Sequence, residues 1–102
     1  MKLFPDFVVN LKNNGPHNRF LLATIQVMSH EQTLIDTTKH HLPAIRHELL
    51  LLLSELEFEA IRATEARAAL QSQALDVVNG VLEREKVKDP LEGLYFTQFV
   101  IE

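Results

Sequence analysis

Residues 19–28 read RFLLATIQVM, a run in which apolar side chains return at every second position. Successive side chains of a β-strand point to opposite faces, so a period of two places one set of residues on a single face. We therefore predict a strand over Arg19–Met28. Its buried face carries four apolar side chains: Leu21, Ala23, Ile25 and Val27.

An earlier strand is predicted over residues 6–11, where Phe7, Val8 and Val9 supply the aromatic and β-branched side chains that favour extended backbone. Residues 13–16 read NNGP. Asparagine and glycine tolerate the backbone angles of turns, and proline cannot donate to a strand ladder. Two strands joined by a short polar connection predict an antiparallel hairpin.

A helix is predicted to follow the hairpin. Ser29 and Gln32 have the spacing of a capping box, which places the helix start near His30. Pro43 lies inside the apolar helical pattern that follows, and it removes the hydrogen bond to the Lys39 carbonyl at a cost of about 3 kcal/mol in a helix interior. We expect a kink near residues 40–42, or two helical pieces that meet there. The apolar positions of this pattern are Leu34, Ile35, Leu42, Ile45, Leu49 and Leu52.

Residues 49–53 are five consecutive leucines. A helix that is apolar on every side is normally buried on every side. We therefore expect this half of the helix to lie between the sheet and the next helix.

A second long helix is predicted over residues 57–86, ending before Asp89 and Pro90. Its alanines favour helix and would permit a neighbouring element to approach closely. Gly80 is a weak point near its end. The predicted apolar stripe consists of Phe58, Ile61, Leu70, Ala74, Val77, Val78, Val81 and Leu82.

The last strand is predicted over residues 94–101, with Tyr95 and Phe99 on one face and Phe96 on the other. A strand with bulky residues on both faces is usually central in its sheet or covered on both sides. The complete prediction is an α+β fold with the order β-β-α-α-β. A small three-stranded sheet, antiparallel or mixed, packs against two long helices, and residues 1–102 form a single domain.

The amino-acid composition excludes several classes of function. The chain has 102 residues, 46% of them hydrophobic, no cysteine and a formal charge of −4. Disulfide scaffolds and thiol catalysis are excluded, and scattered lysines and arginines argue against nucleic acid and anionic lipid as partners. The longest apolar run, Leu49 to Leu53, is far shorter than the roughly 20 residues that span a bilayer. We expect no targeting segment or membrane anchor within this chain.

No catalytic or metal constellation is predicted. His40 and His47 are seven residues apart, about 10 Å along a helix, which is too far for one ion without further ligands. Glu55, Glu57 and Glu59 are expected to complement a helix dipole at the junction of the two helices rather than to form an acid/base pair. We therefore expect neither a cofactor nor a metal, although a small histidine-based enzyme or metal protein stays open as an alternative.

Mixed charge on the second helix offers a candidate contact surface. Glu59, Arg62, Glu65 and Arg67 lie within two turns, with opposite charges at i, i+3 spacing. Such residues are commonly a solvated face, but complementary charge also suits a head-to-tail contact with another subunit or partner.

The ordered motifs resemble those of the FliL family of flagellar basal-body-associated proteins. The matching segments read DFVVNL, RFLLATIQV, LPAIRHELLLLLS, VVNGVL and LYFTQFVIE, in that order along the chain. The VNL, L-P-x-I-R and F-T-x-F-V-I motifs within them are similar to the family's own. The resemblance spans essentially the whole sequence, and the order of five motifs carries it.

This resemblance implies a non-enzymatic flagellar protein whose fold is similar to the stomatin/SPFH domain. It implies a bacterial inner-membrane protein with this chain on the periplasmic side and its transmembrane anchor missing here. The implied partners are MotA/MotB-type stator proteins, the basal body and other copies of the chain in a ring, which would support stator activation, torque and motility. A stomatin-like membrane scaffold unrelated to flagella is the alternative.

Overall fold

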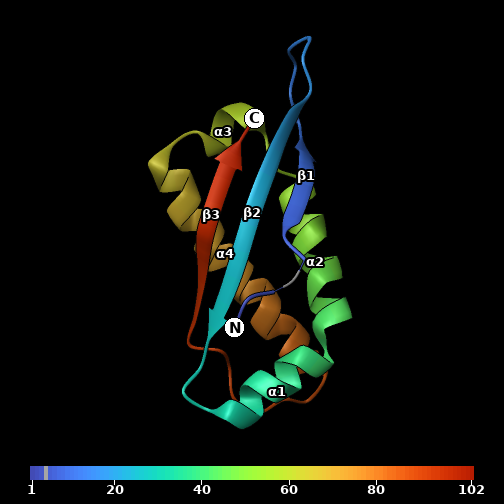
Figure 1. The fold of residues 1–102 in the computed structure, drawn as a ribbon, viewed down its shortest axis with the longest axis vertical. Coiled ribbons are helices and arrows are strands. Elements are labelled where there is room, and N and C mark those ends of the chain that lie inside the picture. Colours follow the sequence, from blue (N-terminus) through green and yellow to red (C-terminus); the bar gives the residue numbers. More distant parts are fainter. Residues whose placement is uncertain (4) are drawn as a thin grey trace.

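A computed structural model describes residues 1–3 and 5–102; Phe4, within the domain predicted over 1–102, lies outside the described residues. The three strands form a single sheet. Figure 1 shows this sheet as one layer, with helices packed behind it. The predicted α+β class is therefore confirmed. The elements, in chain order, are β1 (Phe7–Leu11), β2 (Arg19–Met28), α1 (Gln32–His40), α2 (Leu42–Ser54), α3 (Phe58–Ile61), α4 (Thr64–Arg84) and β3 (Gly93–Ile101).

The sheet is antiparallel throughout, with the strand order β1-β2-β3. The predicted hairpin is confirmed, since Leu11 of β1 pairs with Arg19 of β2. The last strand predicted over residues 94–101 is confirmed as β3, but its expected position is wrong: β3 lies at an edge, β2 is the central strand, and Tyr95 is 44% exposed on β3. Large side chains on both faces of β3 thus do not make it central.

A β-bulge in β3 explains part of this error. Ile25 pairs with Phe96 and Thr24 pairs with Gln98, which leaves Thr97 as an extra residue without a partner on β2. An extra residue reverses the alternation of faces beyond it. Phe96 and Phe99, predicted on opposite faces, therefore lie on the same face, with ring centroids 5.2 Å apart in an edge-to-face arrangement.

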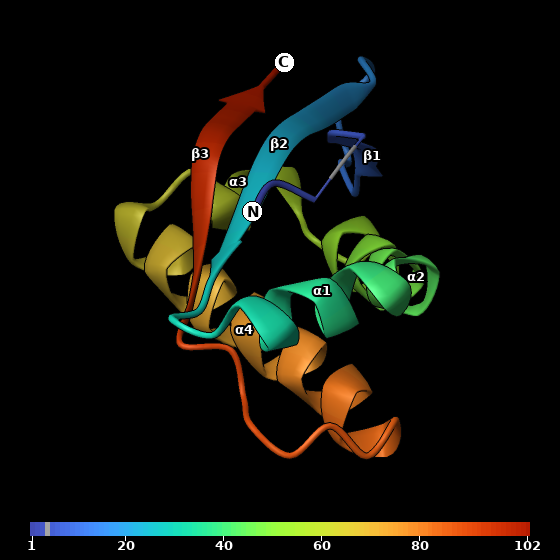
Figure 2. The same cartoon turned by 60° about the horizontal axis from the view of Figure 1, so that its bottom comes forward.

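The inner face of the sheet forms the core together with the helices. Leu21, Ala23 and Ile25 of β2 are completely buried and Val27 nearly so, as the period-two pattern predicted. The helices cover this face alone, as Figure 2 shows when the molecule is turned by 60°. One contiguous cluster of buried side chains joins all seven elements.

The first predicted helix is two helices. α1 ends at His40 and α2 begins at Leu42, with Pro43 in the first turn of α2, where a missing N–H costs little. The expectation of two pieces meeting near residues 40–42 is confirmed. The predicted capping box is wrong, because α1 begins at Gln32 and the Ser29 hydroxyl accepts a hydrogen bond from the Glu31 N–H (3.1 Å) outside the helix.

The leucine run of α2 is not buried on every side. Leu49 and Leu53 are completely buried, whereas Leu51 is 52% exposed on the opposite side of the helix. α2 contacts both α4 and β1 of the sheet, as expected, but the side of the helix that carries Leu51 is left exposed. Ile45, Leu49 and Leu53, spaced one turn apart, form its buried face.

The second predicted helix is also divided. The short α3 ends at Ile61, and α4 begins at Thr64 after Ala63 adopts an extended conformation. The apolar stripe is confirmed, since its members are buried except for the half-buried Phe58 and Val77. The alanines of this segment do not, as a group, pack against a neighbouring element. Ala74 is buried and Ala66 is half-buried, but the others are exposed, namely Ala60, Ala63, Ala68 and Ala69.

α4 ends in a Schellman motif. The Lys86 N–H donates to the Glu83 carbonyl (3.0 Å), and the Val87 N–H donates to the Leu82 carbonyl (2.9 Å). Lys86 has a φ of 63°, in the left-handed region where glycine is usual at this position. The helix therefore stops at Arg84, two residues before the predicted end, and the chain turns back toward β3.

Candidate functional site

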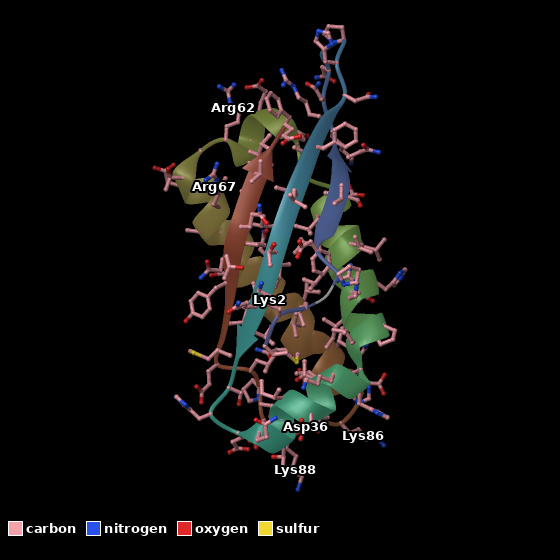
Figure 3. All side chains as sticks on the ribbon, in the orientation of Figure 1. Lys2, Asp36, Arg62, Arg67, Lys86 and Lys88 are labelled. Carbon is pink, nitrogen blue, oxygen red and sulfur yellow. The ribbon has the colours of Figure 1, made fainter. Side chains whose placement is uncertain are left out.

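The predicted contact residues lie at the corner between α3 and α4. Arg62 pairs with Glu59 at 3.2 Å, as the i, i+3 spacing predicted. Because the helix is interrupted at Arg62 and Ala63, Glu65 and Arg67 belong to a different helix from Glu59. The second predicted pair, Arg62 with Glu65, is absent from the ion pairs formed by residues 1–3 and 5–102. Figure 3 shows Arg62 and Arg67 at the same end of the molecule.

Two backbone pairings bring β2 to this corner. Arg19, the first residue of β2, pairs with Leu11 across the hairpin. Lys12, which follows Leu11 in the chain, makes two backbone hydrogen bonds of 2.9 Å. Its carbonyl accepts from the Phe58 N–H, and its own N–H donates to the Leu56 carbonyl. These bonds fix α3 beside the start of β2, and so place Phe58 next to Arg19.

The result is a hollow of about 500 Å³ that we call the arginine pocket, lined by Arg19, Phe58, Glu59, Arg62, Arg67 and Ile101. The Arg19 guanidinium carbon lies 4.5 Å from the centre of the Phe58 ring, and that of Arg62 lies 5.5 Å from the same ring. Arg67 lies over Phe99 at 4.9 Å. Each arginine is thus held by an aromatic face through a cation–π contact.

Charge in the arginine pocket is unbalanced. Three arginines against one glutamate leave a formal excess of two positive charges in a chain whose overall charge is −4. Within the described part of the chain, Arg19 and Arg67 contact aromatic rings and pair with no carboxylate. Their hydrogen-bond donors therefore have no anionic partner within the protein.

The amino terminus of α4 opens beside the same residues. Its cap residue, Ala63, supplies no side-chain hydrogen bond to the first turn, although Glu65 in that turn partly offsets the helix dipole. The two flanking arginines, Arg62 and Arg67, add their charges to the positive end of a 21-residue helix.

Sequence reasoning identified Arg62 and Arg67 but missed Arg19, Phe58 and Phe99 as their neighbours. Phe58 was assigned only to the apolar stripe, and Arg19 only to the start of a strand. No local signal could have joined them, because their proximity depends on the pairing of Lys12 with α3 and on the bulge that turns Phe99 inward.

The histidines form no metal site. His40 and His41 make an edge-to-face ring contact at 5.5 Å, while His30 lies 3.2 Å from Glu92 at the surface. Across residues 1–3 and 5–102, no group of three histidine, aspartate or glutamate side chains is arranged to hold an ion.

The acidic residues at the helix junction have separate structural roles. Glu55 is the C-cap residue that follows α2 and forms a 2.7 Å ion pair with Lys12, and Glu57 precedes α3. The hydrogen bond from Lys12 and the positive charge of Lys12 lower the pKa of the Glu55 carboxyl. The same hydrogen bond and the negative charge of Glu55 raise the pKa of Lys12. The expectation that these carboxylates complement a helix dipole applies to Glu59, in the first turn of α3, and not to Glu55.

Arg46, within the L-P-x-I-R motif, fastens the start of the chain to α2. Its guanidinium donates to the carbonyls of Pro5 and Leu3 and lies 4.1 Å from the centre of the Phe7 ring. Burial lowers the pKa of Arg46, and the charge of Asp6 opposes that shift. Arg46 thus has a structural role that its position in a motif did not reveal.

The outer face of the sheet is left uncovered by the described elements. Val8, Leu22 and Val100 pair across the three strands and form an apolar row on it. Val8 is 62% exposed, and Phe20, Met28 and Tyr95 are the other large apolar side chains exposed on this sheet. An apolar surface of this kind commonly marks a protein–protein contact.

The fold and these surfaces therefore define the class of the protein: it is an α+β protein with surfaces suited to contact with other proteins. A family model described as "Flagellar basal body-associated protein FliL" matches residues 1–101. A protein of Aquifex aeolicus (strain VF5) named "Flagellar protein FliL" is 29% identical over 101 residues, covering 99% of this chain and 60% of that relative.

The chain belongs to the FliL family, whose model is described as that of flagellar basal body-associated proteins. This is a family of flagellar accessory proteins and not of enzymes, which confirms the non-enzymatic prediction. The chain spans 60% of the length of the Aquifex relative. Among the described residues, no helix combines the length and apolar character needed to cross a membrane.

Proposed function

We propose that residues 1–102 are a single periplasmic domain of an inner-membrane flagellar protein. In this proposal the domain assembles with other copies into a ring around MotA/MotB-type stator units and supports their activation, torque and motility. The membrane anchor would lie in a part of the protein outside this chain. Membership of the FliL family over residues 1–101 is the observation that carries the proposal.

The surface of the molecule supports an assembly role. A free strand edge on β3 and the uncovered outer face of the sheet both offer unfilled contact surface. The corner formed by Glu59, Arg62, Glu65 and Arg67 supplies the mixed charge that a head-to-tail subunit contact requires. A ring built from complementary contacts would use the apolar surface of the sheet and the charged corner together.

Site-directed crosslinking tests the proposal, because residues 1–102 contain no cysteine and an introduced one reports on a single position of this domain. Any cysteine elsewhere in the full-length protein is replaced by serine first. Single cysteines at Val8 and Glu65 probe the outer face and the charged corner in the full-length protein within cells. Lys88→Cys, exposed at the opposite end, is the matched control. We expect Val8→Cys or Glu65→Cys to crosslink to a second copy or to a stator protein, and Lys88→Cys to do so much less.

The same strains measure motility. Deletion of the gene is expected to reduce swimming under high load, and the wild-type gene should restore it. Normal swimming of the deletion strain, together with cysteine variants that remain monomeric and unlinked to stator proteins, would contradict the proposal. The alternative of a scaffold unrelated to flagella would gain support from that result.

A further inference from the structure

We propose that the arginine pocket is a receptor for carboxylate side chains on an acidic segment of a partner protein. The proposal deepens the proposed function, because it rests on the α3–α4 corner being a contact surface and names the chemistry that this corner recognises. It does not depend on which flagellar protein provides the segment.

The arginine pocket contains hydrogen-bond donors that no carboxylate of the described residues occupies. An arginine carries five N–H donors in a planar fork that matches a carboxylate. Arg19 and Arg67 direct their guanidinium groups at ring faces and pair with no carboxylate in the described residues. A ring contact consumes no carboxylate hydrogen bond, so these donors stay available to a ligand.

The arginine side chains of the pocket are pre-organised by aromatic rings. A free arginine loses side-chain entropy when it binds, but the rings of Phe58 and Phe99 already restrict Arg19, Arg62 and Arg67. Phe99 is in turn held by its edge-to-face contact with Phe96. The ring contacts therefore reduce the side-chain entropy that the three arginines would lose on binding a ligand.

The charge of the pocket is complementary to a carboxylate. The residues that line it have a formal excess of two positive charges, and Glu65 in the first turn of α4 offsets only part of this excess. The ion pair between Glu59 and Arg62 is weak, since both side chains are mostly exposed to solvent. An incoming carboxylate would meet three guanidinium groups and one like charge, which favours binding.

A protein segment fits these features better than a lipid surface. The pocket is local, and the molecule as a whole carries a charge of −4, which disfavours approach to an anionic bilayer. Its walls include the apolar side chains of Phe58 and Ile101, which suit the aliphatic stem of a glutamate or the neighbouring residues of a peptide.

The test titrates the 102-residue chain with a fluorescein-labelled hexaglutamate peptide, and with hexaglutamine as the neutral counterpart. We expect saturable binding of hexaglutamate and none of hexaglutamine. The double variant Arg19→Gln/Arg67→Gln should weaken binding about tenfold or more, because each lost charge-assisted hydrogen bond is worth at least a factor of this size.

The matched control is Lys86→Gln/Lys88→Gln. It removes the same two positive charges from exposed positions at the opposite end of the molecule, as Figure 3 shows. Binding should change little in this variant. Circular dichroism and thermal unfolding of both double variants establish that any loss is not a loss of fold.

A further variant, Arg67→Lys, keeps the charge but removes the planar fork, and should give intermediate binding. Several results would overturn the proposal: no saturable binding of hexaglutamate, equal weakening by the arginine and lysine pairs, or equal binding of hexaglutamine. Arginine-dependent binding to vesicles of phosphatidylglycerol and phosphatidylethanolamine that exceeds peptide binding would overturn it in favour of a lipid surface.

Failure here is distinguishable from failure of the proposed function. If hexaglutamate does not bind but cells carrying Arg19→Gln/Arg67→Gln lose crosslinks and motility, the contact surface stands and its carboxylate chemistry is wrong. If hexaglutamate binds as expected while crosslinking and motility are unaffected, the receptor stands and the ring proposal loses its support at this corner.

Discussion

The two faces of β2 have different environments: one packs against the helices and the other is left without a covering layer. Leu21 is completely buried against the helices, whereas its neighbour Leu22 lies on the outer face and is only half-buried. Both faces carry apolar residues, yet helices cover only one of them. Buried apolar area stabilises the fold, while apolar area left in solvent is available for contact with another protein.

The largest expected effect separates these faces directly. Leu21→Ala should lower the free energy of unfolding by about 3 kcal/mol, because it removes buried methyl groups and leaves a cavity. Leu22→Ala should lower it by about 1 kcal/mol or less, since Leu22 contributes mainly cross-strand contacts with Val8 and Val100. Urea denaturation of the two variants measures the difference, and equal losses would show that the outer face is as important to stability as the inner one.

The bulge at Thr97 offers a second comparison, by deletion. Removing Thr97 should leave Phe96 and Phe99 facing inward and give a regular ladder, so the fold should persist with a small loss of stability. Removing Tyr95 instead shifts the alternation, so that either Leu94 or Phe96 turns toward solvent. Exposing that side chain should lower the free energy of unfolding by about 2 kcal/mol.

Thermal unfolding monitored by circular dichroism ranks the two deletions. A larger loss from deletion of Thr97 than from deletion of Tyr95 would mean that the bulge itself, through the local twist of the sheet, holds β3 in place.

The smallest expected effect is at Lys86, an exposed residue that affects stability through its backbone conformation. Lys86→Gly should raise the free energy of unfolding by about 0.5–1 kcal/mol, because glycine relieves the left-handed backbone penalty, partly offset by its greater freedom in the unfolded chain. Lys88→Gly is the control, because its φ is not positive, and should be neutral or slightly destabilising. Urea denaturation again provides the measurement, and a destabilised Lys86→Gly variant would contradict this account.

Much of the fold could be predicted from local patterns. The alternation in residues 19–28 gave β2 with its correct bounds and its buried face, and Pro43 marked the division between α1 and α2. The family also followed from ordered motifs in the sequence. The division between α3 and α4 at Ala63 was missed, because Ala63 is a good helix former and nothing nearby is a helix breaker.

The candidate site was predictable only in part. Arg62 and Arg67 were chosen for their spacing on one predicted helix, but the structure places them on either side of a helix break. What makes them a pocket is the arrival of Arg19 and Ile101 from the sheet. Spacing along a helix could not reveal partners from other elements.

By itself the sequence determined which segments are extended or helical and which face of β2 is buried, because hydrophobic periodicity and proline act within a few residues of the backbone. Only the tertiary structure decided that β3 is an edge strand, that its bulge turns Phe96 and Phe99 to the same side, and that three arginines meet at one corner. These features depend on pairing between strands and packing between layers, which bring together residues that no local pattern connects.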